Sequence, residues 1–227
     1  MNNYGVVVND IGMNRMLTSF QQEYLYPIAR RLFPVHASQF DGHHSFMVRY
    51  QAGEDLGLDM HTDDSDVTFN ICLGLAGFIG ATLQFCGMFG SPNHRQWSHT
   101  YTHEMGRAIL HLGSRRHGAE DIISGTRINL IVWNYNSVYR RSAVGQHRST
   151  TTNMHYQREA GPPDPVCVSW THDRDYVKYK PYPPESIRAK HRIHPWCPPR
   201  GKEYHGYYDN HESNNDEEKK IFGPDEL

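Results

Sequence analysis

A stripe of apolar side chains between residues 14 and 33 is the first regular pattern in the chain. Its members recur at three- and four-residue intervals, a spacing typical of one face of an amphipathic helix. Pro27 lies inside the pattern, and because proline lacks a backbone N–H, we expect it to kink the helix or to start a second one. The stripe comprises Leu17, Phe20, Tyr24, Leu25, Ile28 and Leu32.

From residue 46 to residue 139 the pattern changes to short runs rich in β-branched and aromatic residues. Runs of this length between turn-forming residues are typical of strands. Their regular spacing predicts an all-β core, a sandwich or jelly roll, with the N-terminal helix beside it. The predicted strands are residues 46–50, 67–73, 82–85, 100–103, 108–112 and 127–133.

One stretch in this region has the length of a membrane span. Residues 67–90 contain no charged side chain in 24 positions, which is enough for a transmembrane helix. Glycines divide the stretch into pieces of strand length, so we interpret it as part of the β core and expect no membrane span. These glycines are Gly74, Gly77, Gly80, Gly87 and Gly90.

The character of the chain changes again after Ala143. The following residues are dense in Pro, Tyr, His and charge and show no sustained apolar period, so they cannot build a second core. We expect residues 1–143 to form the folded domain. Residues 144–227 are expected to form an irregular, partly disordered C-terminal extension that ends in an acidic stretch.

Composition narrows the class of protein. The 227 residues are 37% hydrophobic and 21% charged, which suits a domain with a sizeable core and excludes disorder of the whole chain. The formal net charge of -2 gives no general attraction for polyanions, so no nucleic-acid partner is expected. Four cysteines are too few for a disulfide scaffold and fit a reducing compartment as well as an oxidising one.

The two ends of the chain bear on its location. The first residues show no basic segment followed by a sustained apolar stretch, so no secretory signal is expected and the prediction is a cytoplasmic or nuclear protein. The last four residues, 224–227, read Pro-Asp-Glu-Leu and are similar to the Lys-Asp-Glu-Leu retrieval signal. The endoplasmic reticulum is therefore the alternative if a leader precedes this chain.

The candidate chemistry begins at His61-Thr-Asp63. In an extended strand, residues two apart project to the same face, so this imidazole and this carboxylate can bind one ion. His117, just after an apolar strand and at a turn of small residues, is the third candidate ligand, and His111 is its rival. Two histidines and one carboxylate are the ligand set of non-haem Fe(II) oxygenases.

Ten residues beyond His117, Arg127 stands at the head of an apolar strand. Alternation along a strand places it on the same face as Asn129, Ile131 and Trp133. A cation that enters a β core needs an anion to offset its desolvation, and a planar guanidinium suits a carboxylate. We therefore expect Arg127 to bind an anionic ligand.

These residues carry a resemblance to a known family. His61-x-Asp63, His117 and Arg127, within His-Gly-x-x-x-x-x-Ser-Gly-Thr-Arg, resemble the Fe(II)- and 2-oxoglutarate-dependent dioxygenases of the prolyl and lysyl hydroxylase type. The likeness is greatest to the 2-oxoglutarate and iron-dependent oxygenase domain-containing proteins. It covers residues 4 to about 140, and it includes the Val-Arg-Tyr of residues 48–50 and the strand of residues 66–73.

The resemblance implies a fold and a set of roles. The fold would be a double-stranded β-helix, in which His61, Asp63 and His117 bind Fe(II) and Arg127 grips the distal carboxylate of 2-oxoglutarate. Tyr50 and Asn70 would contact the same cosubstrate, and ascorbate would be a further cofactor. The implied reaction consumes dioxygen and hydroxylates a side chain of a protein or peptide.

One departure from the family pattern and two alternative functions stay open. The family shows Gly-Gly-x-Leu-x-Phe, whereas Ala81 stands at the second glycine here. The first alternative is a catalytically silent member that uses the barrel as a binding module. The second is a cupin-like metalloenzyme that does not use 2-oxoglutarate, in which Arg127 would have no cosubstrate to bind. The sequence predicts neither the substrate nor the oligomeric state.

Overall fold

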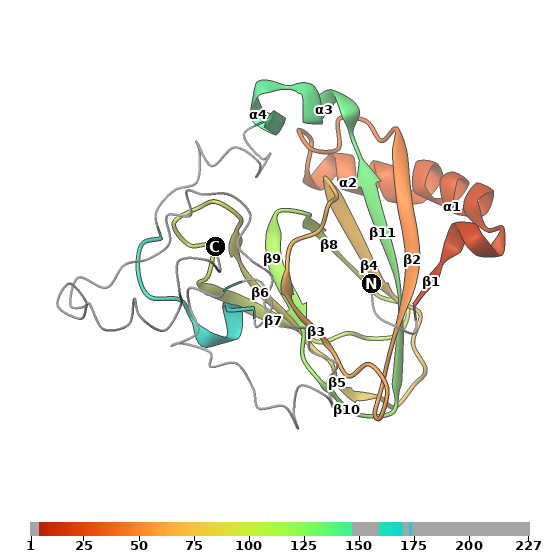
Figure 1. Cartoon of the computed structure of the whole chain (residues 1–227). Coiled ribbons are helices and arrows are strands. Elements are labelled where there is room, and N and C mark those ends of the chain that lie inside the picture. The colour runs from red at the N-terminus through yellow and green to blue at the C-terminus, as the bar shows by residue number, and fades with distance from the viewer. Residues whose placement is uncertain (1–4, 147–158, 170–172, 174–227) are drawn as a thin grey trace, which may run out of the picture.

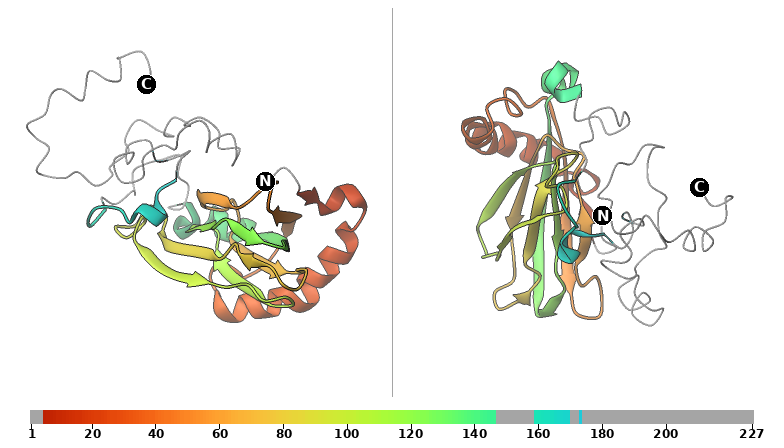
Figure 2. Two further views of the ribbon diagram at one scale, coloured as in Figure 1. Left: turned by 90° about the horizontal axis from the view of Figure 1, so that it is seen from below. Right: turned by 90° about the vertical axis from the view of Figure 1, so that its left-hand side faces the viewer.

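The structure, a computed structural model, describes residues 5–146, 159–169 and 173. Its centre is a pair of antiparallel β-sheets that face each other, with helices on one side (Figures 1 and 2). The larger sheet has five strands in the order β1-β2-β11-β4-β8. The smaller has four, in the order β3-β9-β6-β7, and β5 and β10 form a separate pair.

The strands follow the chain in a jelly-roll path. From β2 onward, and leaving aside the separate pair β5 and β10, successive strands alternate between the two sheets, except that β6 and β7 are neighbours in the smaller sheet. This alternation is the double-stranded β-helix that the sequence predicted. The strand bounds are β1 (Val6–Val7), β2 (Gly42–Gln51), β3 (Leu58–His61), β4 (Val67–Cys72), β5 (Ile79–Gly80), β6 (Leu83–Met88), β7 (Trp97–Tyr101), β8 (Ala108–Leu112), β9 (Arg115–Ala119), β10 (Ile122–Ser124) and β11 (Thr126–Tyr135).

The alternation of side chains gives the larger sheet two different faces. Its inner face packs against the smaller sheet through an apolar core that includes Phe46, Val48, Leu83, Phe85 and Ile131. Its outer face packs against the N-terminal helices through a second core that includes Val67, Phe69 and Val132. The strands are therefore buried on both sides, and any polar residue on the inner face lies inside the sandwich.

The predicted N-terminal helix is present, and it follows a single course through a wide turn. The segments are α1 (Asn14–Phe20), a π-helical turn (Gln21–Leu25) and α2 (Tyr26–Leu32). Pro27 lies at the start of α2, in agreement with the expectation that it starts a second helix. Proline offers no N–H to the preceding turn and its ring crowds a carbonyl there, so the wider π turn accommodates it.

The wide turn changes which residues of the stripe are buried. Leu17, Gln21, Leu25 and Ala29 face the sheet, at intervals of four residues. Gln21 donates a hydrogen bond to the Oδ1 of Asn134 over 2.8 Å. The prediction was wrong for Tyr24, Ile28 and Leu32, which are exposed, because a π turn takes more residues than an α turn and rotates the following face.

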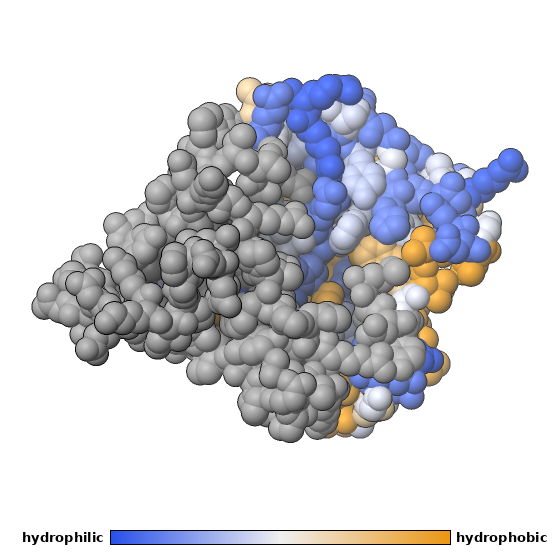
Figure 3. All heavy atoms as spheres, in the orientation of Figure 1, coloured by the Kyte–Doolittle hydropathy of each residue, from blue (hydrophilic) through white to orange (hydrophobic). Residues whose placement is uncertain are grey.

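Other apolar side chains also reach the surface near the N-terminus. Val6, Ile11 and Met13 are exposed, and Figure 3 shows apolar atoms at the right-hand edge, next to β1 and the first helical turns. Two short helices, α3 (Ser137–Arg141) and α4 (Ala143–Gln146), follow β11. Figure 3 shows mainly hydrophilic atoms in their region.

The uncharged stretch of residues 67–90 forms β4, β5 and β6, as predicted. Gly74 and Gly77, between β4 and β5, and Gly80, at the end of β5, have positive φ angles, a backbone conformation that favours glycine. Within the described ranges, no helix has the length and apolar character needed to cross a membrane.

A segment beyond the predicted domain packs on the smaller sheet. We call residues 159–169 together with Asp173 the strap. A disulfide joins its Cys167 to Cys86 of β6, and Ser169 donates a hydrogen bond from Oγ to Asp59 of β3 over 2.7 Å. Asp164 accepts a hydrogen bond from the backbone N–H of Trp97 over 2.6 Å. The boundary at residue 143 stays a prediction, because residues 147–158, 170–172 and 174–227 lie outside the described part.

Buried charges hold the strap in place. Arg95, Arg116, Glu159 and Asp173 are all at most 4% exposed. Arg95 pairs with both carboxylates, and Arg116 pairs with Asp173. Arg116 also donates from Nε to the carbonyl oxygen of Cys167 over 2.6 Å. Since a buried charge needs a paired and hydrogen-bonded partner, these four side chains form one cluster that closes only when the strap is docked.

The cluster predicts a pH dependence of stability. Burial by itself would raise the pKa of Asp173, but Arg116 and Arg95 outweigh burial, and the pKa lies below its ordinary value of 3.8. A lowered pKa contributes stability above the unfolded-state value, and this stability is lost as pH falls through the folded-state value. Asp173→Asn should therefore lower the free energy of unfolding by about 3–5 kcal/mol at pH 7.

Urea unfolding of the two proteins across pH 2–7 measures this effect. The difference should shrink below about pH 4. Asp10→Asn, which alters an exposed carboxylate, is the control and should leave the curve unchanged. A difference between Asp173→Asn and the original protein that persists unchanged at pH 2 would contradict the role of this charge.

The disulfide gives a second prediction. Cys86 and Cys167 are 81 residues apart, and closing a loop of this size is worth about 2–4 kcal/mol. Cys167→Ala should lower the free energy of unfolding by that amount without reductant, and the difference should largely vanish in dithiothreitol. Mass spectrometry of denatured, alkylated protein checks the pairing directly: modification of Cys86 in non-reduced protein would show that the bond is absent.

Candidate metal centre and the polar residues beside it

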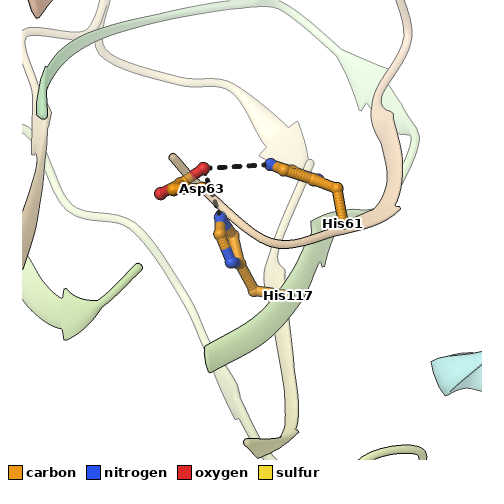
Figure 4. A group of neighbouring side chains, drawn as sticks. All are labelled: His61, Asp63 and His117. Carbon is orange, nitrogen blue, oxygen red and sulfur yellow. Dashed lines mark ion pairs between the residues drawn. The ribbon is translucent and has the colours of Figure 1, made fainter. Parts of the chain in front are cut away.

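The structure brings three ligand-type side chains together between the sheets. His61 ends β3, and its direct partner in the neighbouring strand β9 is His117. The Nε2 atoms of these histidines lie 3.5 and 3.7 Å from Oδ1 of Asp63. All three ligand atoms lie within 4.8 Å of one another, and Figure 4 shows the side chains converging.

The local backbone differs from the sequence interpretation in two ways. The strand ends at His61, so Asp63 does not continue its face; instead the Asp63 N–H donates to the carbonyl of Gly113 over 2.9 Å, which turns the carboxylate inward. His117 lies in the middle of β9 and not in a turn, because Gly113 and Ser114 already complete the turn. Sheet pairing therefore places both histidines.

The two imidazoles are held in the form that binds a cation. His61 makes a hydrogen bond from Nδ1 to the carbonyl of Asp59 over 2.8 Å, and His117 makes one to the carbonyl of Arg115 over 2.9 Å. A carbonyl oxygen only accepts, so in the neutral ring the proton is on Nδ1. The Nε2 lone pair then faces Asp63, as in histidines that ligate metals.

The charges of the site also suit a cation. Burial lowers the pKa of His117 to about 3, so this ring is neutral. For Asp63, burial is outweighed by the neighbouring histidines, and its pKa lies well below the ordinary value. Burial alone would lower the pKa of His61, but Asp63 outweighs it and the pKa is raised. Thr68 donates to Oδ2 of Asp63 over 2.7 Å, which leaves Oδ1 facing the histidines.

The rival ligand His111 lies beside this group. Its ring centre is 4.4 Å from that of His117, and its Nε2 is 3.9 Å from Oδ2 of Asp63, on the side away from the shared oxygen. Its Nδ1 makes a hydrogen bond to the carbonyl of Leu112 over 3.0 Å. The group of converging ligand atoms consists of His61, Asp63 and His117 without it.

Arg127 lies on the inner face of the larger sheet and is 1% exposed. Its guanidinium carbon is 4.7 Å from the ring centre of Tyr50, its direct partner on β2. It donates from Nη1 to the carbonyl of Ala81, while its buried Nε has no hydrogen-bond partner among the described residues. In the described part of the chain, no carboxylate pairs with this cation, and burial lowers its pKa.

Ala81, which stands at the second glycine position of the Gly-Gly-x-Leu-x-Phe pattern, holds Arg127 through its backbone carbonyl. Its φ of 53° is in the left-handed region, where glycine is the ordinary residue. The residue is fully buried, and its N–H donates to the carbonyl of Asp121 over 3.1 Å. This backbone geometry aims the Ala81 carbonyl at Arg127.

Polar residues continue from Arg127 toward the ligand group. Asn129 shares the inner face with Arg127 and donates from Nδ2 to Oδ1 of Asn70. The same Nδ2 lies 3.1 Å from Nε2 of His103, a residue that sequence reasoning missed. His103 was included in a predicted strand, but β7 ends at Tyr101. No spacing in the sequence connects His103 with Asn129, 26 residues away.

Parts of the chain are similar in sequence to known proteins. Residues 1–38 match a family model described as an OGFOD2-like domain. Over 146 residues the chain is 41% identical to 2-oxoglutarate and iron-dependent oxygenase domain-containing protein ICU11 of Arabidopsis thaliana, a match covering 62% of this chain and 36% of that protein. Over 144 residues it is 35% identical to 2-oxoglutarate and iron-dependent oxygenase domain-containing protein 2 of Homo sapiens, covering 63% and 41%.

Among solved structures, prolyl 4-hydroxylase from Phytophthora capsici matches with a TM-score of 0.44 and 16% identity, over 59% of this chain and 48% of that one. The chain spans less than half the length of the two relatives. Over 62–63% of its own length, this chain is similar in sequence to the 2-oxoglutarate and iron-dependent oxygenase domain-containing proteins.

Proposed function

We propose that this chain is an Fe(II)- and 2-oxoglutarate-dependent oxygenase that hydroxylates a side chain of a protein or peptide. The observation that carries the proposal is the presence of two incomplete sites in one barrel. One is the converging group of His61, Asp63 and His117. The other is a fully buried arginine without a carboxylate partner among the described residues.

The first site fits Fe(II). Two imidazoles whose Nε2 atoms face one carboxylate, together with that carboxylate, suit a divalent transition metal, and this set leaves further coordination positions open. The backbone carbonyls that fix both Nδ1 protons, and the Thr68 hydroxyl on Asp63, orient the donors before a metal arrives. Mutation of residues that hold the ligands in this way typically lowers metal affinity or activity 10- to 100-fold.

The second site fits the distal carboxylate of 2-oxoglutarate. A buried cation without a counter-ion is unfavourable by several kcal/mol, and a bound carboxylate removes that penalty. Arg127 would grip the carboxylate, Tyr50 would pack against it, and Asn70 would lie along the path between the two sites. When bound, Fe(II) and 2-oxoglutarate supply the activation of dioxygen, and this chain's residues hold both groups and exclude water from them.

The substrate class rests on the resemblance to prolyl and lysyl hydroxylases alone. Ascorbate as a further cofactor and dioxygen as co-reactant belong to the same proposal. The intact ligand group favours an enzyme over the silent binding module. The buried Arg127 favours a 2-oxo acid user over the cupin-like alternative, because that alternative gives the cation no anion.

The disulfide bears on the proposed compartment. The sequence predicts a cytoplasmic or nuclear protein, with the endoplasmic reticulum as the alternative. Disulfides persist mainly in oxidising compartments. An oxidised Cys86–Cys167 pair in protein taken from its native cells would therefore favour the alternative.

The metal site predicts the effect of removing its ligands. His61→Ala and Asp63→Ala should each abolish detectable Co²⁺ binding by calorimetry and, with Fe(II), production of succinate from 2-oxoglutarate, since each removes one of three ligands. His99→Ala is the matched control, because His99 is exposed on β7, and it should bind Co²⁺ normally. Unchanged Co²⁺ binding in both ligand variants would contradict the assigned site.

Arg127 predicts the selectivity for the cosubstrate. Arg127→Met removes the charged donors for the distal carboxylate, and charged hydrogen bonds are worth about 1.5–3 kcal/mol each. Affinity for 2-oxoglutarate should therefore fall about 100-fold or more, with Co²⁺ binding unchanged. Arg107→Met, at an exposed arginine paired with Glu104, should have no effect. If Arg127→Met keeps full affinity for 2-oxoglutarate and full succinate production, the assigned role of Arg127 is contradicted.

A further inference from the structure

His103 lies in the connection between β7 and β8 and is 4% exposed. Its ring packs edge-on against Tyr101, with ring centres 5.1 Å apart, and its Nε2 lies 3.1 Å from Nδ2 of Asn129. Asn129 is on the inner face of β11, two residues from Arg127. A histidine from a connection thus reaches into the core beside the unpaired arginine.

Its neighbours fix where the proton of His103 lies. The Asn129 amide nitrogen donates one hydrogen to Oδ1 of Asn70 and points its second hydrogen at Nε2 of His103. Nε2 therefore accepts, and the proton of the neutral ring is on Nδ1. Burial, followed by the charge of Arg127, lowers the pKa of His103 to about 3, so the ring is neutral.

The Nδ1–H of His103 has no hydrogen-bond partner in the described part of the chain, although it is buried. The same holds for Nε of Arg127. Leaving a buried donor unpaired is unfavourable, so each such donor calls for an acceptor. Two unpaired donors on neighbouring side chains, one of them charged, suit the same acceptor, an anion with more than one oxygen.

We propose that His103 donates a hydrogen bond from Nδ1 to the distal carboxylate of the 2-oxo dicarboxylate that Arg127 binds. His103 is then a specificity-determining residue that favours a dicarboxylate over a 2-oxo monocarboxylate. The inference rests on the proposed function, because it names a second residue at the same cosubstrate. Asn129 and Asn70 act as positioning residues that hold the imidazole with its donor toward the carboxylate.

Two conservative substitutions separate a donor role from a structural role. Asparagine places its amide near the position of Nδ1 and loses the contact with Asn129. Glutamine places its amide near the position of Nε2, keeps a partner for Asn129 and loses the donor at Nδ1. Both proteins, together with His103→Ala, are loaded with redox-inert Zn²⁺ and checked for folding by thermal melting.

Binding is measured by calorimetry with 2-oxoglutarate and with 2-oxopentanoate, which carries a methyl group in place of the distal carboxylate. We expect His103→Gln and His103→Ala to lose affinity for 2-oxoglutarate about 10- to 100-fold, the range for a hydrogen bond to a charged group. Their affinity for 2-oxopentanoate should not change, and His103→Asn should keep most of the preference for the dicarboxylate. His99→Gln, an exposed control, should match the original protein.

The opposite ranking, with His103→Gln normal and His103→Asn impaired, would overturn the donor role and leave His103 as a support for Asn129. An equal loss of affinity for 2-oxoglutarate and 2-oxopentanoate in every variant would overturn the donor role as well. These outcomes differ from failure of the proposed function, in which the original protein binds Zn²⁺ but neither 2-oxo acid.

Discussion

The burial of one positive charge without a counter-ion in the described part of the protein is the constraint on which the site depends. Arg127 lies within an apolar sandwich, where its guanidinium donates to the carbonyl of Ala81 and contacts Tyr50, and no carboxylate of the described chain pairs with it. A buried charge of this kind persists only if other parts of the fold offset its desolvation cost or if a bound ligand supplies the counter-ion. The large apolar core on both faces of the sheet supplies the first condition, and the proposed carboxylate supplies the second.

The two sheets of the jelly roll carry different parts of the site. The smaller sheet carries both histidines of the ligand group, on adjacent strands whose register sets their spacing. The larger sheet carries Arg127, Asn129 and Asn70 on its inner face. The strap contacts the smaller sheet on the same two strands, through Asp59, two residues before His61, and Arg116, directly before His117. Segments far apart in sequence therefore act together on the rigidity of one site.

The strands, the ligand group and Arg127 could be predicted from the sequence, because local patterns of residues indicate them. Short apolar runs predicted the strands, since side chains alternate along a strand. The ligand group and Arg127 were found because charged residues beside apolar runs are rare, and because the motif resembles a known family. The helix stripe was misjudged at Tyr24, Ile28 and Leu32, since the π turn before Pro27 changes the period.

The features that the sequence did not predict depend on contacts between residues far apart in the chain. The Cys86–Cys167 disulfide and the pairing of Arg95 with Asp173 join residues 81 and 78 positions apart, and no periodic pattern predicts such contacts. His103 was hidden for the same reason, because its role depends on the register between β4 and β11. The backbone at Ala81 keeps the turn expected of glycine because tertiary hydrogen bonds hold it there.

The central claim is that the ligand group and Arg127 bind two parts of one ligand assembly. Anaerobic titration of the protein with Fe(II) and 2-oxoglutarate tests it most directly, by visible absorption spectroscopy. We expect a charge-transfer band that needs both additions, is absent in His117→Ala and is lost in Arg127→Met at the 2-oxoglutarate concentration that saturates the original protein. If the protein binds Fe(II) but no band appears with saturating 2-oxoglutarate, or if the band survives in Arg127→Met at full affinity, the account is contradicted.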